Sequence, residues 1–320
     1  MSKIRVGVLR GGPSSEYDVS LKTGANVLKN LPDKYIGYDI FVSRDGAWHI
    51  GGVPVTIGVV TDRVDVIWNA LHGAYGEDGK VQGFLEAARI PYTGSGVFSS
   101  LFAMNKHLAK DRLKNAPVKI PIAEVLERSE DITEVALRIF RSFPQPCVVK
   151  PVANGSSVGV SVARDFNSLV GALERAFAIS DRVLVEEHIK GKEATCGVVD
   201  AFRGAEHYVL PPGEIRVPKE RFFDNELKYS GTTAEIFPGN FTKEEKRILE
   251  EAAVWVHREL GLRHYSRSDF IVSPRGIYFL ESNTLPGLSE ESLFPKALSA
   301  VGSNLSEFTD HVLTLAISRK

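Results

Sequence analysis

The sequence predicts an α/β protein, and three observations support this class. Short runs rich in β-branched residues alternate with amphipathic helical stretches along the 320 residues. Apolar residues make up 43% and charged residues 25% of the chain, which is ordinary globular usage. No apolar stretch approaches the roughly 18 uninterrupted residues of a membrane span. At about 150 residues per domain, a chain of this length predicts roughly two domains.

Charge and cysteine content exclude several classes of protein. The net charge is −1, so the chain lacks the overall positive field that attracts nucleic acid, and we expect neither a nucleic-acid nor a membrane partner. Cys147 and Cys196 are too few for a disulfide framework and are expected to be small buried residues. Arg5 and Arg10 interrupt the apolar residues of the amino terminus, which argues against a signal peptide. We expect a cytoplasmic location.

The local pattern predicts the elements in order. Strands are predicted at residues 4–9, 38–43, 64–71, 146–150, 158–163, 183–188, 194–200, 268–273 and 276–282. Helices are predicted at residues 18–30, 80–89, 99–114, 131–142 and 165–178. A further helix begins at Thr242, which forms a capping box with Glu245, and Gly261 is placed to end it.

Composition shifts divide the chain into three predicted subdomains, 1–97, 98–182 and 183–320. The strand-and-helix pattern of the amino-terminal part stops at residues 90–96, and a helix gives way to a strand near Asp181. The last subdomain contains the longest stretch without predicted structure, residues 211–240. Because loops this long in compact domains are usually lids or disordered, we predict a mobile lid there.

Two glycine-rich segments follow predicted strands, at the end where ligands of open α/β sheets bind. Residues 10–20 lead from a strand through glycines and hydroxyls into a helix, which suits an anion but is also common as a structural turn. Glu16 in this segment is expected either to meet a substrate ammonium group or to cap the helix. Residues 71–83 contain His72 and four glycines, more than a simple turn needs, and predict a second binding loop.

A third segment, residues 147–163, joins two predicted strands by a loop that contains glycines, Ser156 and Ser157. Free backbone N–H groups and hydroxyls in such a loop can fold over phosphates. Lys150 ends the preceding strand and supplies a point charge. The segment therefore predicts a hairpin that covers nucleotide phosphates.

A fourth segment, residues 183–193, is a strand that ends in acidic residues. Alternation along the strand sends Glu186 to one face and Glu187 to the other. Such a strand end can offer backbone groups and a carboxylate to one ligand. A solvated acidic strand end is the alternative interpretation.

The fifth segment, residues 266–287, carries the most specific pattern. Alternation places Arg267 and Asp269 on one face of one strand, and Glu281 and Asn283 on one face of the next. A hairpin brings these oxygen donors together beside a guanidinium group. Carboxylate and amide oxygens without His or Cys suit magnesium, so we predict a metal site formed by Asp269, Glu281 and Asn283.

These five segments, in this order, resemble those of the D-alanine–D-alanine ligases, members of the ATP-grasp superfamily. The resemblance covers nearly the whole chain, from Val6 to Leu315. It implies an ATP-grasp fold with an amino-terminal open α/β subdomain, a central subdomain, and a carboxyl-terminal subdomain that holds nucleotide and metal. It also implies ATP-dependent ligation of two D-alanines through an acyl phosphate. This reaction supplies precursors of peptidoglycan, which builds the cell wall and maintains cell shape.

The resemblance implies a role for each matched residue. The implied nucleotide ligands are Lys106, Lys150, Ser156, Ser157, Glu186, Glu187, Ile189, Glu193 and Lys228. The implied substrate ligands are Glu16, His72, Arg267, Gly287, Ser292 and Leu293. The implied metal ligands are Asp269, Glu281 and Asn283, for two magnesium ions with manganese as a substitute. The implied catalytic set is Glu16, Ser156, Tyr229, Arg267, Gly287 and Ser292.

The resemblance also implies how this set works. Tyr229, Ser156 and Glu16 form one hydrogen-bonded set that connects the lid to the substrate, while Arg267 and the N–H of Gly287 hold an oxyanion. One departure concerns Asn105, which stands where the family usually has aspartate before the lysine of the central helix. Because Asn caps a helix about as well as Asp, this change is expected to preserve the structure.

Two alternatives stay open. A D-alanine–D-lactate ligase, or another ATP-grasp carboxylate–amine ligase, has the same nucleotide site; Tyr229 argues against the former, since depsipeptide-forming relatives usually lack that tyrosine. A catalytically silent nucleotide-binding protein is expected to have lost a phosphate or metal ligand, yet the sequence retains the implied set. The expected small-molecule partners are ATP and D-alanine, and the expected assembly is a homodimer.

Overall fold

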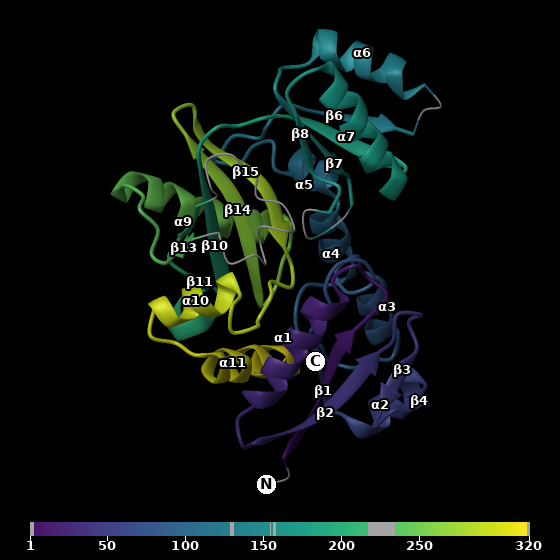
Figure 1. Cartoon of the computed structure of the whole chain (residues 1–320). Helices are drawn as coiled ribbons and strands as arrows, with labels where there is room; N and C mark the ends of the chain where they lie inside the picture. Colours follow the sequence, from purple (N-terminus) through teal and green to yellow (C-terminus); the bar gives the residue numbers. More distant parts are fainter. Residues whose placement is uncertain (1–2, 129–130, 154, 156–157, 217–233, 319–320) are drawn as a thin grey trace.

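The computed structural model describes residues 3–128, 131–153, 155, 158–216 and 234–318, whose strands form three sheets (Figure 1). The strands are β1 (Ile4–Gly11), β2 (Tyr35–Val42), β3 (Trp48–Ile50), β4 (Val53–Val55), β5 (Val66–Asn69), β6 (Ala123–Glu127), β7 (Cys147–Pro151), β8 (Ser161–Ala163), β9 (Arg182–Glu187), β10 (Lys192–Asp200), β11 (His207–Val209), β12 (Gly213–Arg216), β13 (Ala234–Ile236), β14 (Tyr265–Ser273) and β15 (Gly276–Asn283).

The helices flank these sheets. They are α1 (Tyr17–Lys29), α2 (Ile57–Arg63), α3 (Lys80–Ala87), α4 (Val97–Met104), α5 (Lys106–Arg112), α6 (Ile132–Ser142), α7 (Phe166–Ile179), the 3-10 helix η1 (Phe202–Gly204), α9 (Lys243–Glu259), α10 (Leu293–Ala300) and α11 (Leu305–Ser318).

The first sheet has the order β4-β3-β2-β1-β5. Strand β1 pairs in parallel with β2 and β5, whereas β3 and β4 add an antiparallel edge. Val6, Val8 and Leu9 of β1 are fully buried, as expected for a central strand covered on both faces. Because β1 and β5 are parallel, the two glycine-rich segments that follow them meet at the same edge of the sheet.

The second sheet has the order β6-β9-β7-β8, and all its pairs are antiparallel. Helices α6 and α7 pack together beside it, and Leu169, Leu173 and Phe177 of α7 are buried in its core. This sheet includes β9, which the sequence assigned to the last subdomain from residue 183 onward. The boundary between the second and the third sheet thus lies after β9 and not before it. The predicted division of the chain into three subdomains stays a prediction.

The third sheet has the order β13-β12-β10-β14-β15, with β11 paired to β10. Helix α9 packs against β10 and β14. Its predicted capping box is confirmed: Thr242 N donates to Glu245 Oε2 at 2.7 Å, and Glu245 N donates to Thr242 Oγ1 at 3.2 Å. Gly261 follows the helix with φ +62°, a left-handed conformation that suits glycine at a helix end.

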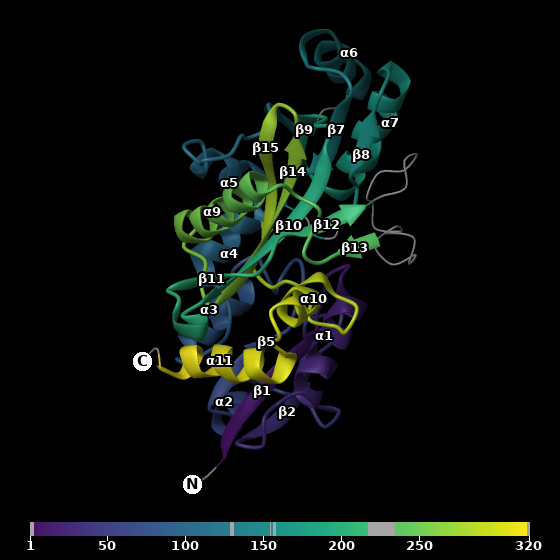
Figure 2. The same ribbon diagram turned by 90° about the vertical axis from the view of Figure 1, so that its left-hand side faces the viewer.

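The two ends of the chain share one hydrophobic core. Trp68 of β5 contacts Phe308 of α11, with ring centroids 6.1 Å apart, and stacks on Tyr265 of β14 at 6.2 Å. Figures 1 and 2 both show α11 beside the first sheet. This packing fixes the amino-terminal loops relative to the β14–β15 hairpin, and so fixes the parts of the candidate site that come from opposite ends of the chain.

Two sequence predictions are wrong in detail. The single helix expected at 99–114 is two helices, α4 and α5, because Asn105 has an extended conformation (φ −85°, ψ 99°) and its side chain caps the second helix. The stretch at 211–240, expected to lack structure, contains β12 and β13 at its ends. Its middle lies outside the described residues.

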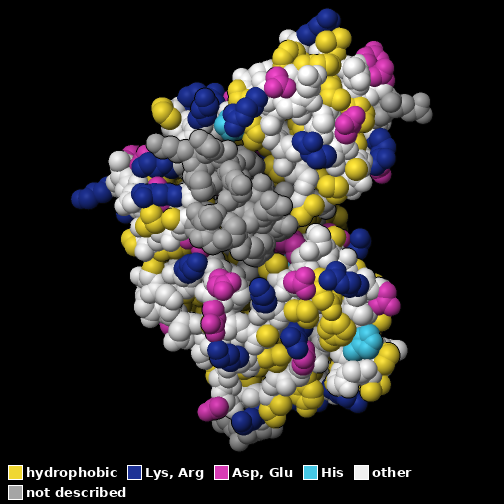
Figure 3. Space-filling model, viewed as in Figure 1, with side chains coloured by type: hydrophobic (Ala, Val, Ile, Leu, Met, Phe, Trp, Pro, Cys, Tyr) yellow, Lys and Arg dark blue, Asp and Glu magenta, His cyan; other side chains and the backbone are white. Residues whose placement is uncertain are grey.

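Besides β12 and β13, eight elements among the described residues were not predicted. Seven are short, β3, β4, α2, β6, β11, η1 and α10, and the eighth is the 14-residue helix α11. On the face shown in Figure 3, basic and acidic side chains are interspersed, in keeping with a net charge of −1. None of the helices in the described part of the chain combines the length and apolar composition needed to cross a lipid bilayer.

Candidate active site

The predicted hairpin is confirmed and has the expected register. Strand β14 pairs with β15 so that Arg267 lies opposite Asn283, and Asp269 opposite Glu281. A β-bulge follows Asp269, where the register shifts before Phe270. Bulges often re-aim side chains next to functional sites. The four polar side chains therefore lie on one face at one end of the hairpin.

Asp269 is the centre of this group. Its carboxylate accepts two hydrogen bonds from Arg267, Nε to Oδ1 at 3.0 Å and Nη2 to Oδ2 at 2.8 Å. Thr195 Oγ1 on the neighbouring strand donates to Oδ1 at 2.6 Å, and Asn283 Nδ2 donates to Oδ2 at 3.2 Å. Burial disfavours the charged guanidinium, but the ion pair with Asp269 outweighs it and raises the pKa of Arg267.

The donor set fits a magnesium ion. Asp269 and Glu281 contribute carboxylates, and Asn283 uses its amide nitrogen toward Asp269, which leaves its amide oxygen available to a cation. These are hard oxygen donors, and magnesium binds to a few such groups together with substrate phosphates. Within this set of three, no imidazole or thiolate is present to favour a softer metal.

Lys106, from the central part of the chain, lies beside an acidic side chain of the hairpin. Lys106 Nζ lies 3.3 Å from Glu281 Oε2, so the first residue of α5 meets the hairpin. Asn105 fixes the start of α5, since Leu108 N donates to its Oδ1 at 3.1 Å, and Lys106 N donates to Val152 O at 3.0 Å. The prediction that Asn105 caps this helix is confirmed.

Lys150 takes part in a buried charge cluster that the sequence did not reveal. Its Nζ lies 2.7 Å from Glu186 Oε2, while Lys110 of α5 pairs with Oε1 of the same carboxylate. All three side chains are at most 8% exposed. Burial lowers the pKa of Lys110 to about 7. Burial opposes ionisation of Glu186 as well, but the two ammonium groups outweigh it and lower the pKa of this carboxyl.

The residues expected around the adenine lie along β9 and the start of β10. Glu187 accepts from Ile122 N at 3.2 Å and from Arg275 Nη2 at 3.0 Å, so its carboxylate joins two loops. Ile189 is buried, and Glu193 lies in β10 opposite Ile271 of β14. A nucleotide role for Glu187, Ile189 and Glu193 stays a prediction.

The amino-terminal loops meet the loop after β7 at Glu16. A Cβ atom on Gly73 would lie 2.7 Å from Glu16 Oε2, and one on Gly155 would overlap the same oxygen. Only glycines allow this approach of two loops to one carboxylate. Glu16 occupies the N-cap position of α1, but its side chain makes no capping hydrogen bond there, so the capping alternative is wrong.

His72 is buried rather than open to solvent. Its Nε2 lies 2.9 Å from Thr23 Oγ1 of α1, and its carbonyl accepts from Ser14 Oγ at 2.6 Å. Burial lowers the pKa of His72 to about 4, which keeps the ring neutral at pH 7. The side chain therefore ties the loop after β5 to α1, and the backbone carbonyl ties that loop to the segment after β1. A direct substrate contact stays a prediction.

Glu77 is a second residue that the sequence did not single out. Its carboxylate accepts from Gly73 N at 2.8 Å, Leu285 N at 3.0 Å and Thr284 Oγ1 at 3.2 Å. It thus joins the loop after β5 to the chain just after β15. Burial, and then the nearby carboxylate of Glu16, raise the pKa of Glu77 to about 7. Its position in a glycine-rich loop gave no sign of this link.

The remaining substrate-side residues lie between β15 and α10. A Cβ atom on Gly287 would lie 2.9 Å from Ser292 Oγ, and Ser292 Oγ lies 2.8 Å from Ser289 Oγ. Leu293 begins α10 and is buried. Asn26 Nδ2 of α1 donates to Leu288 O at 2.7 Å, which fixes this loop against the amino-terminal part.

Four expected site residues, Ser156, Ser157, Lys228 and Tyr229, lie outside the described residues. Their roles stay predictions. Gly155, which precedes the two serines, is described and lies against Glu16. The loop that contains Gly155 and the carboxylate of Glu16 are therefore neighbours at this point.

Comparisons with known proteins identify the family. The family pattern described as "D-ala D-ala ligase C-terminus" matches residues 113–314, and "D-ala D-ala ligase N-terminus" matches residues 53–95. The D-alanine--D-alanine ligase of Geobacter sulfurreducens is 41% identical, over 98% of this chain and 94% of that protein. The protein of the same name from Syntrophotalea carbinolica is 38% identical, over 99% and 97%.

Solved structures agree with this assignment. The VanG D-Ala:D-Ser ligase from Enterococcus faecalis matches with a TM-score of 0.86 and 30% identity, over 98% of this chain and 99% of that chain. The D-alanine--D-alanine ligase from Bacillus anthracis complexed with ATP matches with a TM-score of 0.80 and 32% identity, over 99% and 98%. The expected ATP-grasp fold is confirmed. By sequence and by structure, the chain belongs to the D-alanine–D-alanine ligase family.

Proposed function

We propose that this chain joins two D-alanines in an ATP-dependent reaction that passes through D-alanyl phosphate and supplies peptidoglycan precursors. The observation that carries the proposal is the convergence of the hairpin carboxylates, the Arg267 guanidinium and the Lys106 ammonium at one end of β14 and β15. Such a cluster combines positive charge for phosphates with oxygen donors for a metal. The names of the relatives support the same activity.

The first step activates a carboxylate, which is a poor acyl donor by itself. One carboxylate oxygen of the first D-alanine attacks the γ-phosphorus of ATP, and ADP leaves. Lys106 and Lys150 offset the charge on the transferring phosphoryl group, which is mainly a matter of positioning and electrostatics. Asp269, Glu281 and Asn283 would hold magnesium, which neutralises phosphate charge when bound.

The second step forms the peptide bond. The amine of the second D-alanine attacks the acyl carbon and loses a proton, and phosphate leaves, so the products are the dipeptide, ADP, phosphate and a proton. Arg267 and the N–H of Gly287 stabilise the oxyanion of the tetrahedral intermediate. Glu16 binds the ammonium group of the first substrate, and Ser292 receives the carboxylate of the second.

The identity of the second substrate, the acceptor, is the one part of the proposal for which the observations name an alternative. One structural relative is named as a D-Ala:D-Ser ligase, and the sequence left a D-lactate acceptor open. We propose D-alanine, because the named sequence relatives are D-alanine--D-alanine ligases at 41% and 38% identity. The homodimer and the cytoplasmic location remain predictions.

A substrate panel tests the proposed function. Phosphate release is measured with ATP and magnesium and with either D-alanine or L-alanine as the sole amino acid. In further mixtures L-alanine, D-serine or D-lactate is added to D-alanine, and the products are identified by mass. We expect release with D-alanine alone and the dipeptide as the main product of every mixture. Equal release with L-alanine, or none with D-alanine at millimolar concentration, contradicts the assignment.

A further inference from the structure

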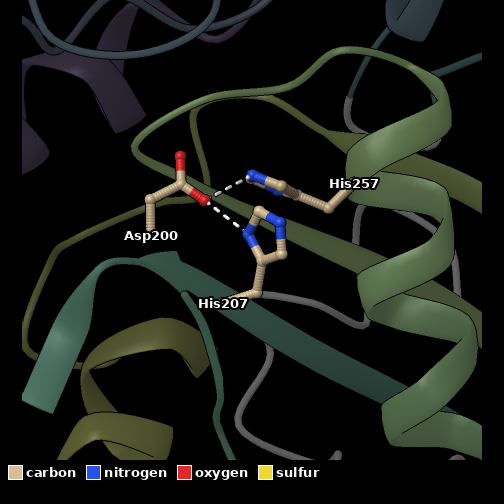
Figure 4. A group of neighbouring side chains, drawn as sticks. All are labelled: Asp200, His207 and His257. Atoms are coloured by element: carbon tan, nitrogen blue, oxygen red, sulfur yellow. Dashed lines mark hydrogen bonds and ion pairs between the residues drawn. The ribbon is translucent and has the colours of Figure 1, made fainter. Parts of the chain in front are cut away.

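A second cluster of chemically active side chains lies at the far end of β10. Asp200 ends β10, His207 begins β11, and His257 lies in the last turn of α9 (Figure 4). Asp200 Oδ1 lies 2.9 Å from His207 Nδ1 and 3.0 Å from His257 Nε2. The three ligand atoms all lie within 4.8 Å of one another.

This cluster is separate from the candidate active site. Thr195, which bonds to Asp269, lies on the same strand as Asp200 but five residues before it. At about 3.3 Å per residue, the strand carries Asp200 roughly 16 Å away from that point. The proposed ligation uses neither Asp200 nor the two histidines, so their arrangement needs its own explanation.

Asp200 and His257 are each oriented by a partner outside the cluster. Asp200 Oδ2 accepts from His264 N at 2.7 Å, which turns Oδ1 toward the histidines. His257 Nδ1 lies 2.7 Å from the buried Ser266 Oγ, and His207 Nε2 lies 3.9 Å from Glu206 Oε1. Histidines that bind metals almost always use their second nitrogen in this way.

His257 supplies an independent observation. Its side chain is fully buried, and its Nε2 forms no well-aligned hydrogen bond with any described residue, although it lies 3.0 Å from Asp200 Oδ1. When Nδ1–H donates to Ser266, Nε2 carries a lone pair that faces the carboxylate. Two lone pairs at this distance repel unless a proton or a cation lies between them, and the zinc titration below distinguishes the two.

We propose that Asp200 Oδ1, His207 Nδ1 and His257 Nε2 bind a divalent transition-metal ion, with Zn²⁺ preferred. Two imidazole nitrogens and one carboxylate oxygen suit zinc and disfavour magnesium. Tetrahedral ligands about 2.0–2.2 Å from zinc are roughly 3.3 Å apart, so the distances from Asp200 Oδ1 to the two histidine nitrogens need to lengthen by only a few tenths of an ångström. The side chains of His207 and Asp200 are 19% and 21% exposed, so water has access to the fourth position.

The ion would act as a structural cross-link. It joins the end of β10 and its paired strand β11 to α9, which packs against both strands. Because the unfolded chain does not hold the ligands together, zinc stabilises the folded state by mass action. The site belongs to the scaffold of the third sheet and not to the ligation chemistry.

Zinc binding to the metal-stripped protein tests the proposal. Zn²⁺ alone, without nucleotide or magnesium, is titrated against the full chain in competition with a chromogenic chelator, and melting is recorded with and without zinc. We expect one equivalent of bound zinc and a higher melting temperature. In the same protein, Co²⁺ is expected to give the visible absorption of a four-coordinate site.

Matched variants locate the ion. His207→Gln keeps a hydrogen-bond donor at a partly exposed edge but removes a ligand, and we expect it to lose the zinc and the stabilisation. Ser266→Ala removes an outer partner and is expected to weaken zinc binding by about 10–100-fold. His49→Gln, in β3, and Glu281→Gln, at the candidate magnesium site, are expected to retain the wild-type zinc affinity.

Three outcomes overturn the proposal. The first is that the metal-stripped wild-type protein binds no zinc, which leaves a hydrogen-bonded carboxylate with two imidazoles. The second is that His207→Gln binds zinc as tightly as wild type. The third is that Glu281→Gln abolishes the binding, which assigns the zinc to the hairpin. Each variant is also melted without metal, and its melting curve identifies a variant that fails to fold. In that case the zinc stoichiometry of the wild-type protein decides whether the proposal holds.

Discussion

Lys110 and Lys150 share a single buried carboxylate. Lys150 Nζ lies 2.7 Å from Glu186 Oε2, and Lys110 pairs with Oε1 of the same side chain. The carboxylate thereby holds the end of β7, the strand β9 and the helix α5 in one arrangement. Of the two lysines, only Lys150 was expected at the nucleotide, and Lys110 is the residue that orients Glu186 from the other side.

Replacing Lys110 by methionine tests this relationship. Glu186 then keeps only Lys150 as a counterion and draws it away from the nucleotide phosphates. A hydrogen bond to a charged group contributes about 1.5–3 kcal/mol, so we expect a comparable loss of unfolding free energy and a rise of about tenfold or more in the KM for ATP. The change in kcat is expected to be smaller.

Lys114→Met is the matched control. Lys114 and Asp111 form an exposed ion pair one helical turn apart, and such pairs contribute little. We expect its stability and KM for ATP to stay close to wild type. Equal effects of the two substitutions would show that Lys110 has no special role at the nucleotide.

Local pattern was enough to predict the hairpin but not the charge cluster. Alternation with period two placed Asp269 and Glu281 on one face, and the register of β14 and β15 confirms this. Lys110 lies in a helix with a polar sequence, where a lysine is expected to face solvent. It is buried beside Glu186 of β9, 76 residues further along the chain, and residues close in sequence do not specify this contact.

Other errors have the same physical origin. Asn105 was predicted as a cap, but not as the break between two helices, because a cap inside an apolar run does not by itself show that the preceding helix ends there. Glu77 joins two loops that are 207 residues apart, through its bond to Thr284. Short edge strands such as β4 and β13 are stabilised by their neighbours and carry little pattern of their own.

Asn105 allows a test of helix capping at the site. Asn105→Ala removes the acceptor for Leu108 N and is expected to lower the unfolding free energy by about 1 kcal/mol. Asn105→Asp keeps an acceptor and is expected to retain both stability and a KM for ATP within a few fold. Melting curves and ATP titrations check both variants, and a large change for Asn105→Asp would show that the added charge matters near the nucleotide.

Glu281→Gln tests the predicted metal ligand. Glutamine still accepts a hydrogen bond from Lys106 but binds magnesium more weakly, so we expect a higher magnesium concentration for half-maximal turnover. The unfolding free energy is expected to fall by only about 1 kcal/mol. Glu290→Gln, which breaks an exposed pair with Lys29, is the control and is expected to change neither quantity. An unchanged magnesium requirement in Glu281→Gln would return Glu281 to a structural role.

His72 predicts a specific dependence of stability on pH. Its pKa is about 4 in the folded protein, against 6.5 for an unperturbed histidine, so the unfolded chain binds a proton first as the pH falls. Its contribution to stability is therefore complete above pH 6.5 and is lost between pH 6.5 and pH 4, amounting to about 3 kcal/mol.

His72→Gln checks this dependence. Glutamine retains a hydrogen-bond donor near Thr23 and does not titrate, so its stability is expected to fall less than that of wild type over this pH range. His49→Gln, which removes a histidine in β3, is expected to follow wild type. If the unfolding free energies of wild type and His72→Gln changed in parallel with pH, the folded protein would bind a proton at His72 as readily as the unfolded chain does.

The central claim is that a carboxylate oxygen of the first D-alanine attacks ATP, and oxygen isotope transfer tests it most directly. The full chain is supplied with ATP, magnesium and D-alanine labelled with oxygen-18 in its carboxylate, and the released phosphate is analysed by mass spectrometry. An acyl phosphate requires that each phosphate released with a dipeptide carries one labelled oxygen. Unlabelled phosphate, released together with dipeptide, would contradict the account.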